Sequence, residues 1–193
     1  MKRKSLSKFF FLIVLICAMG VSVHAQEKTY RIGVFASIYL DSAFIDTSYQ
    51  FENQMPRYIL PGLEFVQGAM MAMDSIKSNQ IAMEVFDIRS AGQTIQALSE
   101  KGVFESLDLM IGAIAGNDFK QLSEIALTYQ LPFVSATYPN DGGIRKNPYT
   151  YLINATLPNH INSIHKYMMS QWPTANIVWC RKKGSMEIGC WVI

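Results

Sequence analysis

The chain has 193 residues, of which half are hydrophobic and 17% are charged, and its formal net charge is +2. This composition is typical of a globular protein and excludes a disordered polyelectrolyte. No basic stripe is present that could neutralise a run of phosphates, so no nucleic-acid partner is expected.

The amino terminus has the three parts of a secretory signal. Residues 1–8 carry four basic and no acidic residues, residues 9–19 are an unbroken apolar run, and Val23-His24-Ala25 precedes the expected cut. This pattern predicts a signal peptide over residues 1–25. The apolar run is too short to cross the roughly 30 Å hydrocarbon core, so no membrane span is expected after cleavage. Ile16 stands before Cys17 where a lipoprotein needs a small residue, so lipidation is not expected.

Cleavage would leave two cysteines, Cys180 and Cys190, and a net charge of about −2. An oxidising compartment permits a disulfide between them, but two cysteines near one terminus do not define a disulfide framework, so both states stay open. The basic residues 181–183 beside Cys180 repel cations, and His160 and His165 fall on a predicted surface helix. We therefore expect neither a metal site nor a cofactor.

Strands and helices alternate along the rest of the chain. The predicted strands are residues 30–36, 81–88, 107–114 and 131–135, and the predicted helices between them are residues 62–77, 94–104 and 118–129. Strands that are separated by helices pair in parallel through right-handed crossovers. The sequence therefore predicts a doubly wound α/β fold with a flavodoxin-like parallel sheet, in which residues 30–36 lie between residues 81–88 and 107–114.

Ligands of such sheets bind outside the carboxyl ends of the strands, where helix N-termini also point. Candidate positions are thus Ser37 onward and residues 87–91, 115–118 and 135–140. The connection over residues 37–61 is far longer than the usual 2 to 6 residues and is rich in aromatic residues. A packed surface loop and a ligand lid are equally compatible with it.

The order of these segments resembles one exported family. RIGVF is followed by GLEFVQGAMMAMDSI, FDIRSAGQTIQAL, LMIGAIAGNDFKQLSEIALTYQLPFVSATYPN and YLINATLPNHINSIHKYM. Together they resemble the type I periplasmic solute-binding proteins, and most closely the branch that binds branched-chain amino acids. The resemblance covers roughly residues 30–181, and its specificity lies in the order and spacing of the motifs.

The family's proteins trap a small ligand between two α/β lobes that are joined by crossing segments. The resemblance implies that residues 26–155 form the N-terminal lobe, with the first crossing segment at residues 150–155. Residues 156–193 would then begin a second lobe that is incomplete, as in a truncated protein. That part has a predicted helix with an apolar face of Ile161, Ile164 and Met168, and a predicted strand at 175–180. A complete protein with a single lobe is the alternative.

The resemblance implies a periplasmic substrate-binding protein that captures a small polar solute, such as an amino acid, for the permease of an ABC importer or for a sensor. It implies no enzymatic activity, and the sequence contains neither a G-x-S-x-G elbow nor a P-loop. The alternative is an exported envelope or signalling module that keeps the lobe without binding amino acids. An exported flavodoxin-like enzyme is a third hypothesis, for which no catalytic set is found.

Two loops match the family's ligand-contacting segments. In the first, one of Asn117 and Asp118 is expected to cap a helix and the other to contact ligand. Gly116 departs from the Ser that amino acid binders tend to carry there, and Asp118 adds negative charge, which puts an α-carboxylate ligand in doubt. In the second, Ser135, Thr137 and Tyr138 are expected to contact ligand.

Each of these interpretations has a plainer alternative. Residues 135–143 (SATYPNDGG) are rich in turn formers and could be a turn only. Tyr39, a further candidate ligand contact, or Tyr58 could close over an apolar ligand group. Alternatively, each tyrosine packs the long connection onto its own lobe.

Overall fold

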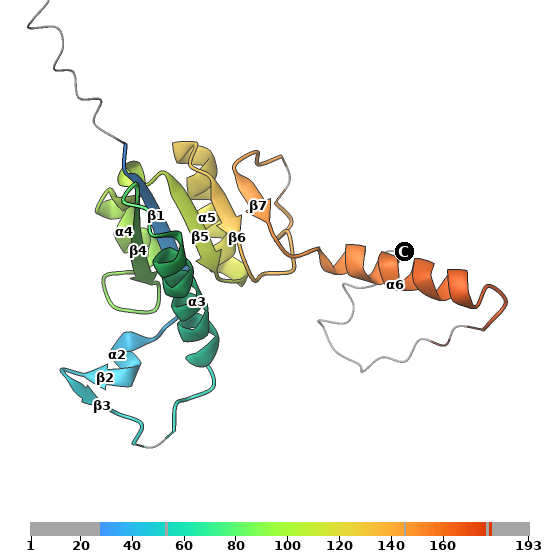
Figure 1. The fold of residues 1–193 in the computed structure, drawn as a ribbon, viewed down its shortest axis with the longest axis horizontal. Coiled ribbons are helices and arrows are strands. Elements are labelled where there is room, and N and C mark those ends of the chain that lie inside the picture. Colours follow the sequence, from blue (N-terminus) through green and yellow to red (C-terminus); the bar gives the residue numbers. More distant parts are fainter. Residues whose placement is uncertain (1–27, 53, 145, 177, 179–193) are drawn as a thin grey trace, which may run out of the picture.

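The structure, a computed structural model, describes residues 28–52, 54–144, 146–176 and 178 (Figure 1). The predicted signal peptide, Cys180 and Cys190 lie outside these ranges, as does half of the strand predicted at 175–180. Within them, no helix combines the length and the apolar character that crossing a bilayer requires.

A five-stranded parallel sheet forms the centre of the molecule. Its strands are β1 (Tyr30–Ala36), β4 (Ile81–Asp87), β5 (Leu109–Ala113), β6 (Phe133–Ser135) and β7 (Thr150–Leu152). They lie in the order β4-β1-β5-β6-β7, and each pair of neighbours is parallel. The predicted α/β class and the predicted place of β1 between β4 and β5 are confirmed.

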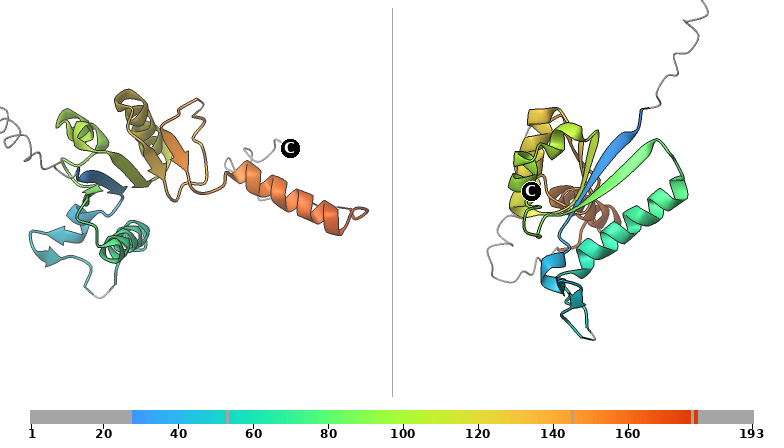
Figure 2. Two further views of the ribbon diagram at one scale, coloured as in Figure 1. Left: turned by 45° about the horizontal axis from the view of Figure 1, so that its top comes forward. Right: turned by 90° about the vertical axis from the view of Figure 1, so that its left-hand side faces the viewer.

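Helices cover both faces of the sheet, as Figures 1 and 2 show. These are α3 (Leu60–Ile76) on one face, and α4 (Ile95–Glu100), the 3₁₀ turn η2 (Val103–Ser106) and α5 (Gly116–Tyr129) on the other. Alternate residues of β1 pack against the helices on the two faces of the sheet, because successive side chains of a strand point to opposite faces. Val34 and Ala36 pack against Val66 of α3. Phe35, fully buried, stacks on Phe86 at 5.0 Å and on Phe104 at 5.8 Å in the other layer.

Several predicted helix bounds are corrected. The helix expected over residues 94–104 ends at Glu100, because Gly102 takes a left-handed conformation (φ 68°) and the chain continues as η2. The helix expected from residue 118 begins at Gly116, and the one expected from residue 62 begins at Leu60 with Pro61 in its first turn.

The long connection over residues 37–61 contains regular structure that the sequence did not predict. A short helix, α2 (Leu40–Ala43), leads into a hairpin of β2 (Phe44–Ile45) and β3 (Ser48–Tyr49). The hairpin lies beyond the sheet, beside α3 (Figure 1). Its aromatic side chains pack on one another, with the rings of Phe44 and Tyr49 5.5 Å apart.

The predicted crossing segment begins inside the sheet. Thr150 to Leu152 form the edge strand β7, and the next residue stays bonded to the end of β6, since the Ile153 amide donates to the Ser135 carbonyl at 3.1 Å. α6 (Leu157–Gln171) then extends away from the sheet (Figure 1) and has no buried residue. On the apolar face expected for this helix, Ile164 is 58% accessible, and Ile161 and Met168 are half-buried. The lobe boundaries stay a prediction.

One glycine sets how closely α3 approaches β1. A Cβ on Gly62 would lie 2.1 Å from the Ser37 carbonyl oxygen, whereas a Cβ on Gly68, in the same helix, would meet nothing within 4 Å. We expect Gly62→Ala to lower the free energy of unfolding by about 1–3 kcal/mol, because backbone must move to relieve the overlap.

The matched control is Gly68→Ala, which is expected to raise the free energy of unfolding by up to about 1 kcal/mol through helix propensity. Urea unfolding of the two variants measures both changes. Equal effects of the two substitutions would contradict a packing role for Gly62.

Candidate functional site

A buried carboxylate holds together the loops that follow β1 and β4. Asp87, the last residue of β4, is only 2% exposed. Its Oδ1 accepts from the amides of Ile38 (2.9 Å) and Arg89 (3.1 Å), and its Oδ2 accepts from the Leu40 amide (2.7 Å) and the Ser90 hydroxyl (2.8 Å). Both oxygens are thus fully used in shaping this edge of the sheet.

Two opposing effects act on the Asp87 carboxyl. Burial disfavours its charged form, but the hydrogen bonds from Leu40, Ile38, Ser90 and Arg89 together outweigh burial. The pKa of Asp87 is therefore held below its ordinary value. Asp87 is anionic at neutral pH and acts in the structure as a fixed acceptor.

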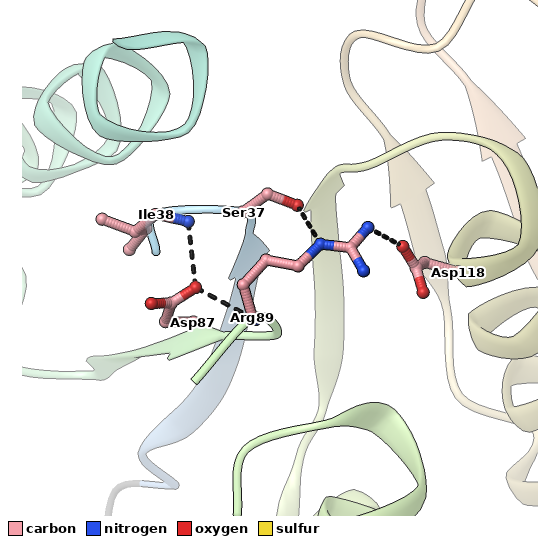
Figure 3. A network of polar contacts seen from close by, with 5 residues as sticks. All are labelled: Ser37, Ile38, Asp87, Arg89 and Asp118. Carbon is pink, nitrogen blue, oxygen red and sulfur yellow. Dashed lines mark hydrogen bonds and ion pairs between the residues drawn. The ribbon is translucent and has the colours of Figure 1, made fainter. Parts of the chain in front are cut away.

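Arg89 bridges the loop after β4, the loop after β1 and the start of α5 (Figure 3). Its Nε donates to the Ser37 hydroxyl at 3.3 Å, and its Nη2 pairs with Asp118 Oδ2 at 2.5 Å. The side chains of Arg89 and Asp118 are 39% and 20% exposed. This places an ion pair across the carboxyl ends of the central strands, where a ligand of the fold would bind.

The structure places Asn117 and Asp118 in the first turn of α5, and neither is its cap. The N-cap is Ala115, which offers no side-chain hydrogen bond, so the predicted Asx cap is wrong. Asp118 instead pairs with Arg89, while Asn117 is exposed. The first N–H groups of a helix have no partner within it, so this uncapped end attracts negative charge.

An open pocket lies beside this helix end. It has a volume of about 490 Å³ and is lined by Gly116, Asn117, Lys120, Tyr138 and residues 140–143. The Tyr138 ring is half-buried against Phe119, with the ring centroids 5.1 Å apart. The fold thus brings together two of the predicted site residues, Asn117 and Tyr138.

The other predicted residues lie elsewhere. Ser135, at the end of β6, is fully buried, and its Oγ has no hydrogen-bond partner among the described residues. Thr137 is exposed, and its carbonyl accepts from the Asn154 side chain at 2.9 Å. Tyr39 has a left-handed backbone (φ 60°) at the start of α2 and packs edge-on against Tyr58 at 4.9 Å. None of these three lines the pocket.

Arg89 is the residue that the sequence analysis did not single out, although it marked residues 87–91 as a candidate position. The available signal was a lone arginine two residues after a strand that ends in aspartate. Within the described ranges, no group of three or more histidine, cysteine, aspartate or glutamate side chains is placed to hold a metal ion.

Similarity to known proteins is found at the level of structure. No protein-family model matches the chain, and no curated protein does. Among solved structures, the chain is similar to the branched-chain amino acid transporter substrate-binding protein LivJ from Streptococcus pneumoniae str. Canada MDR_19A, in complex with isoleucine. The sequence identity is 17% and the TM-score is 0.50.

This similarity covers 76% of the chain described here and 39% of that chain. The matched part of the chain therefore spans well under half the length of its structural neighbour. With the parallel order of its five strands, the similarity shows that the chain shares its α/β fold with part of that substrate-binding protein. The resemblance inferred from the motifs is confirmed at this level.

The Asp87 carboxylate should be visible in the pH dependence of stability. Because its pKa is lower in the folded state, its contribution is complete above the ordinary aspartate pKa and is lost as the pH falls through the folded pKa. We expect Asp87→Asn to lower the free energy of unfolding at pH 7 by about 1–3 kcal/mol, since its amide group would face N–H donors.

This deficit should shrink as the pH falls below about 4, where the native carboxylate also loses its charge. Denaturant unfolding between pH 7 and pH 3 measures it. Asp74→Asn, at an exposed position of α3, is the control and should change little. A deficit that is constant over this range would show that Asp87 acts through its shape alone.

Proposed function

We propose that this protein captures a small polar solute, such as an amino acid, in the periplasm and delivers it to the permease of an ABC importer or to a sensor. One observation carries the proposal: an open pocket beside the uncapped start of α5 contains Asn117 and Tyr138, in a lobe whose fold is shared with a substrate-binding protein. The secretory pattern of residues 1–25 supports export.

A binding role without chemistry is favoured over catalysis. The similar solved structure is a substrate-binding protein that holds isoleucine, not an enzyme. Among the described residues, His160 and His165 are exposed on α6, and neither lines the pocket. We therefore assign the polar groups at this edge to recognition.

The open form of the pocket limits the expected affinity. Small-molecule sites typically bury most of their ligand, and ligand groups that face water gain little from hydrogen bonds, because solvent competes for them. We expect isoleucine, leucine or valine to bind the purified protein no more tightly than about millimolar, near −4 kcal/mol. Calorimetry that gives micromolar binding would show that the open pocket of this lobe is sufficient for tight binding.

The pocket is tested by substitutions in its lining. We expect Asn117→Ala and Tyr138→Ala each to weaken solute binding about fivefold, the equivalent of roughly 1 kcal/mol for one hydrogen bond. Chemical-shift titration by NMR measures dissociation constants in this range. Gln121→Ala is the matched control, because Gln121 is also an exposed polar residue of α5 but lines a different hollow, beside α4.

Equal effects of the three substitutions, or no binding by any amino acid tested, would contradict a solute site in this pocket. The same titration also monitors the fold, because loss of structure changes resonances throughout the lobe.

A second function is favoured by the hairpin. Exposed apolar side chains gather in residues 40–58, where Ile45 is 61% and Phe44 43% accessible. Such a patch suits an exported envelope or signalling module that binds another macromolecule and no amino acid. Cross-linking in cells from position 45, with position 127 of α5 as an equally apolar exposed control, would distinguish the two: a specific adduct only from position 45 supports this role.

A further inference from the structure

One row of side chains crosses the sheet on the side of α3, and its exposure rises from β1 toward β7. The strand register aligns Val85, Val34, Ile111, Val134 and Tyr151, from β4 to β7. The neighbouring residues in β5, β6 and β7 pack in the core on the α5 side, so the last three residues of the row face the α3 side. Val34 is buried beside α3, Ile111 and Val134 are half-buried, and Tyr151 is 53% exposed.

α3 covers only part of this face. The apolar cluster beneath it is formed with β1 and β4 and contains no residue of β5, β6 or β7. A helix is about 10 Å wide and neighbouring strands lie about 4.8 Å apart, so one helix covers about two strands. Figure 2 shows α5 on one side of β6 and β7, and no described helix on the other. An apolar surface that contains Ile111, Val134 and Tyr151, called here the open sheet face, is therefore wide enough for one more helix.

α6 has an apolar face that takes no part in the core. Leu157, Ile161, Ile164 and Met168 recur at steps of four, three and four residues, so they share one face of the helix. Leu157 is 42% and Ile164 58% exposed, and neither apolar cluster of the fold contains a residue of α6. α6 has 15 residues, whereas α5, which packs against the other side of β6 and β7, has 14. The length of α6 thus suits the open sheet face.

Hydrogen bonds direct α6 away from the sheet of its own chain. The residues between β7 and α6 run beside the loop after β6, where the Asn154 side chain donates to the Thr137 carbonyl at 2.9 Å. The Leu157 amide, at the start of the helix, donates to the Pro139 carbonyl at 3.1 Å. Figure 1 shows α6 leaving the sheet beyond β7. The apolar face of α6 and the open sheet face therefore do not meet within one chain.

We propose that two copies of this chain exchange α6, so that the helix of each copy packs on the open sheet face of the other. The exchange is reciprocal and gives a closed dimer with two identical contacts. Covering these side chains in both contacts buries on the order of 1,000 Å², near the lower limit for a specific interface. We therefore expect a dissociation constant of about 10 μM. None of these residues lines the α5 pocket, so the dimer does not depend on the proposed solute site.

Sedimentation velocity of the purified exported protein across the micromolar range measures this dimer. Ile164→Asp on α6 and Tyr151→Lys on the open sheet face are each expected to raise the dissociation constant by a factor of about ten or more, because both contacts would bury a charge. Both side chains are exposed in the single chain, and urea unfolding checks that the variants keep the fold. Leu127→Asp is the matched control, at an apolar position of α5 that is 50% exposed, and should leave the dimer unchanged.

Mixing the two variants tests the exchange itself. In the mixed dimer one contact is native and the other brings opposite charges together, so the mixture is expected to associate about threefold more tightly than either variant alone. Weakening by Ile164→Asp alone would indicate pairing of two helices, and weakening by Tyr151→Lys alone would indicate pairing of two sheet faces. Either result overturns the exchange, as does a native protein that stays monomeric throughout, or an equal effect of Leu127→Asp.

Discussion

The arrangement of the loops at the carboxyl ends of the strands depends on the carboxylate of Asp87. It ends the strand beside β1, is almost wholly buried, and receives amides from the loop after β1 and from its own loop. A buried charge is tolerated only when its lone pairs are satisfied, and here four donors satisfy them. Because the donors come from two separate segments, the bonds also fix where those segments leave the sheet. Ser37 and Arg89 meet above β1 and β4 as a consequence.

The parallel sheet explains why the candidate site lies at the carboxyl ends of the strands. All five strands end on the same side, so the loops after β1, β4, β5 and β6 converge there with the start of α5. The opposite ends of the strands carry an ion pair of a structural kind, Lys28 with Asp108 at 2.6 Å. The asymmetry follows from the topology and does not depend on which ligand is bound.

An element could be predicted from the sequence when it is long enough to show a hydrophobic period or a run of β-forming residues. β1 and β4 are seven-residue runs in which β-forming residues are frequent, and α3 has a clear apolar face, so their existence and order were predictable. Strands of two or three residues, such as β2, β3 and β7, are too short to show a period. Their positions depend on tertiary bonds, for example the 2.6 Å contact between Ser123 and Thr150 that fixes β7 against α5.

The candidate site could also be predicted only in part, because some of its contacts join residues far apart in the sequence. Asn117 and Tyr138 were predictable because they lie within four residues of a strand end, and the loops after parallel strands converge. The Asx cap was predicted wrongly, because local preference at a helix start was outweighed by a partner 29 residues away, Arg89. That pairing has an electrostatic consequence. Asp118 in the first turn would by itself repel an anionic ligand from the positive end of α5, and Arg89 cancels that repulsion while adding donors of its own. The negative residue at this helix start is therefore neutralised by a cation that comes from the loop after β4, and the start of α5 keeps its positive potential.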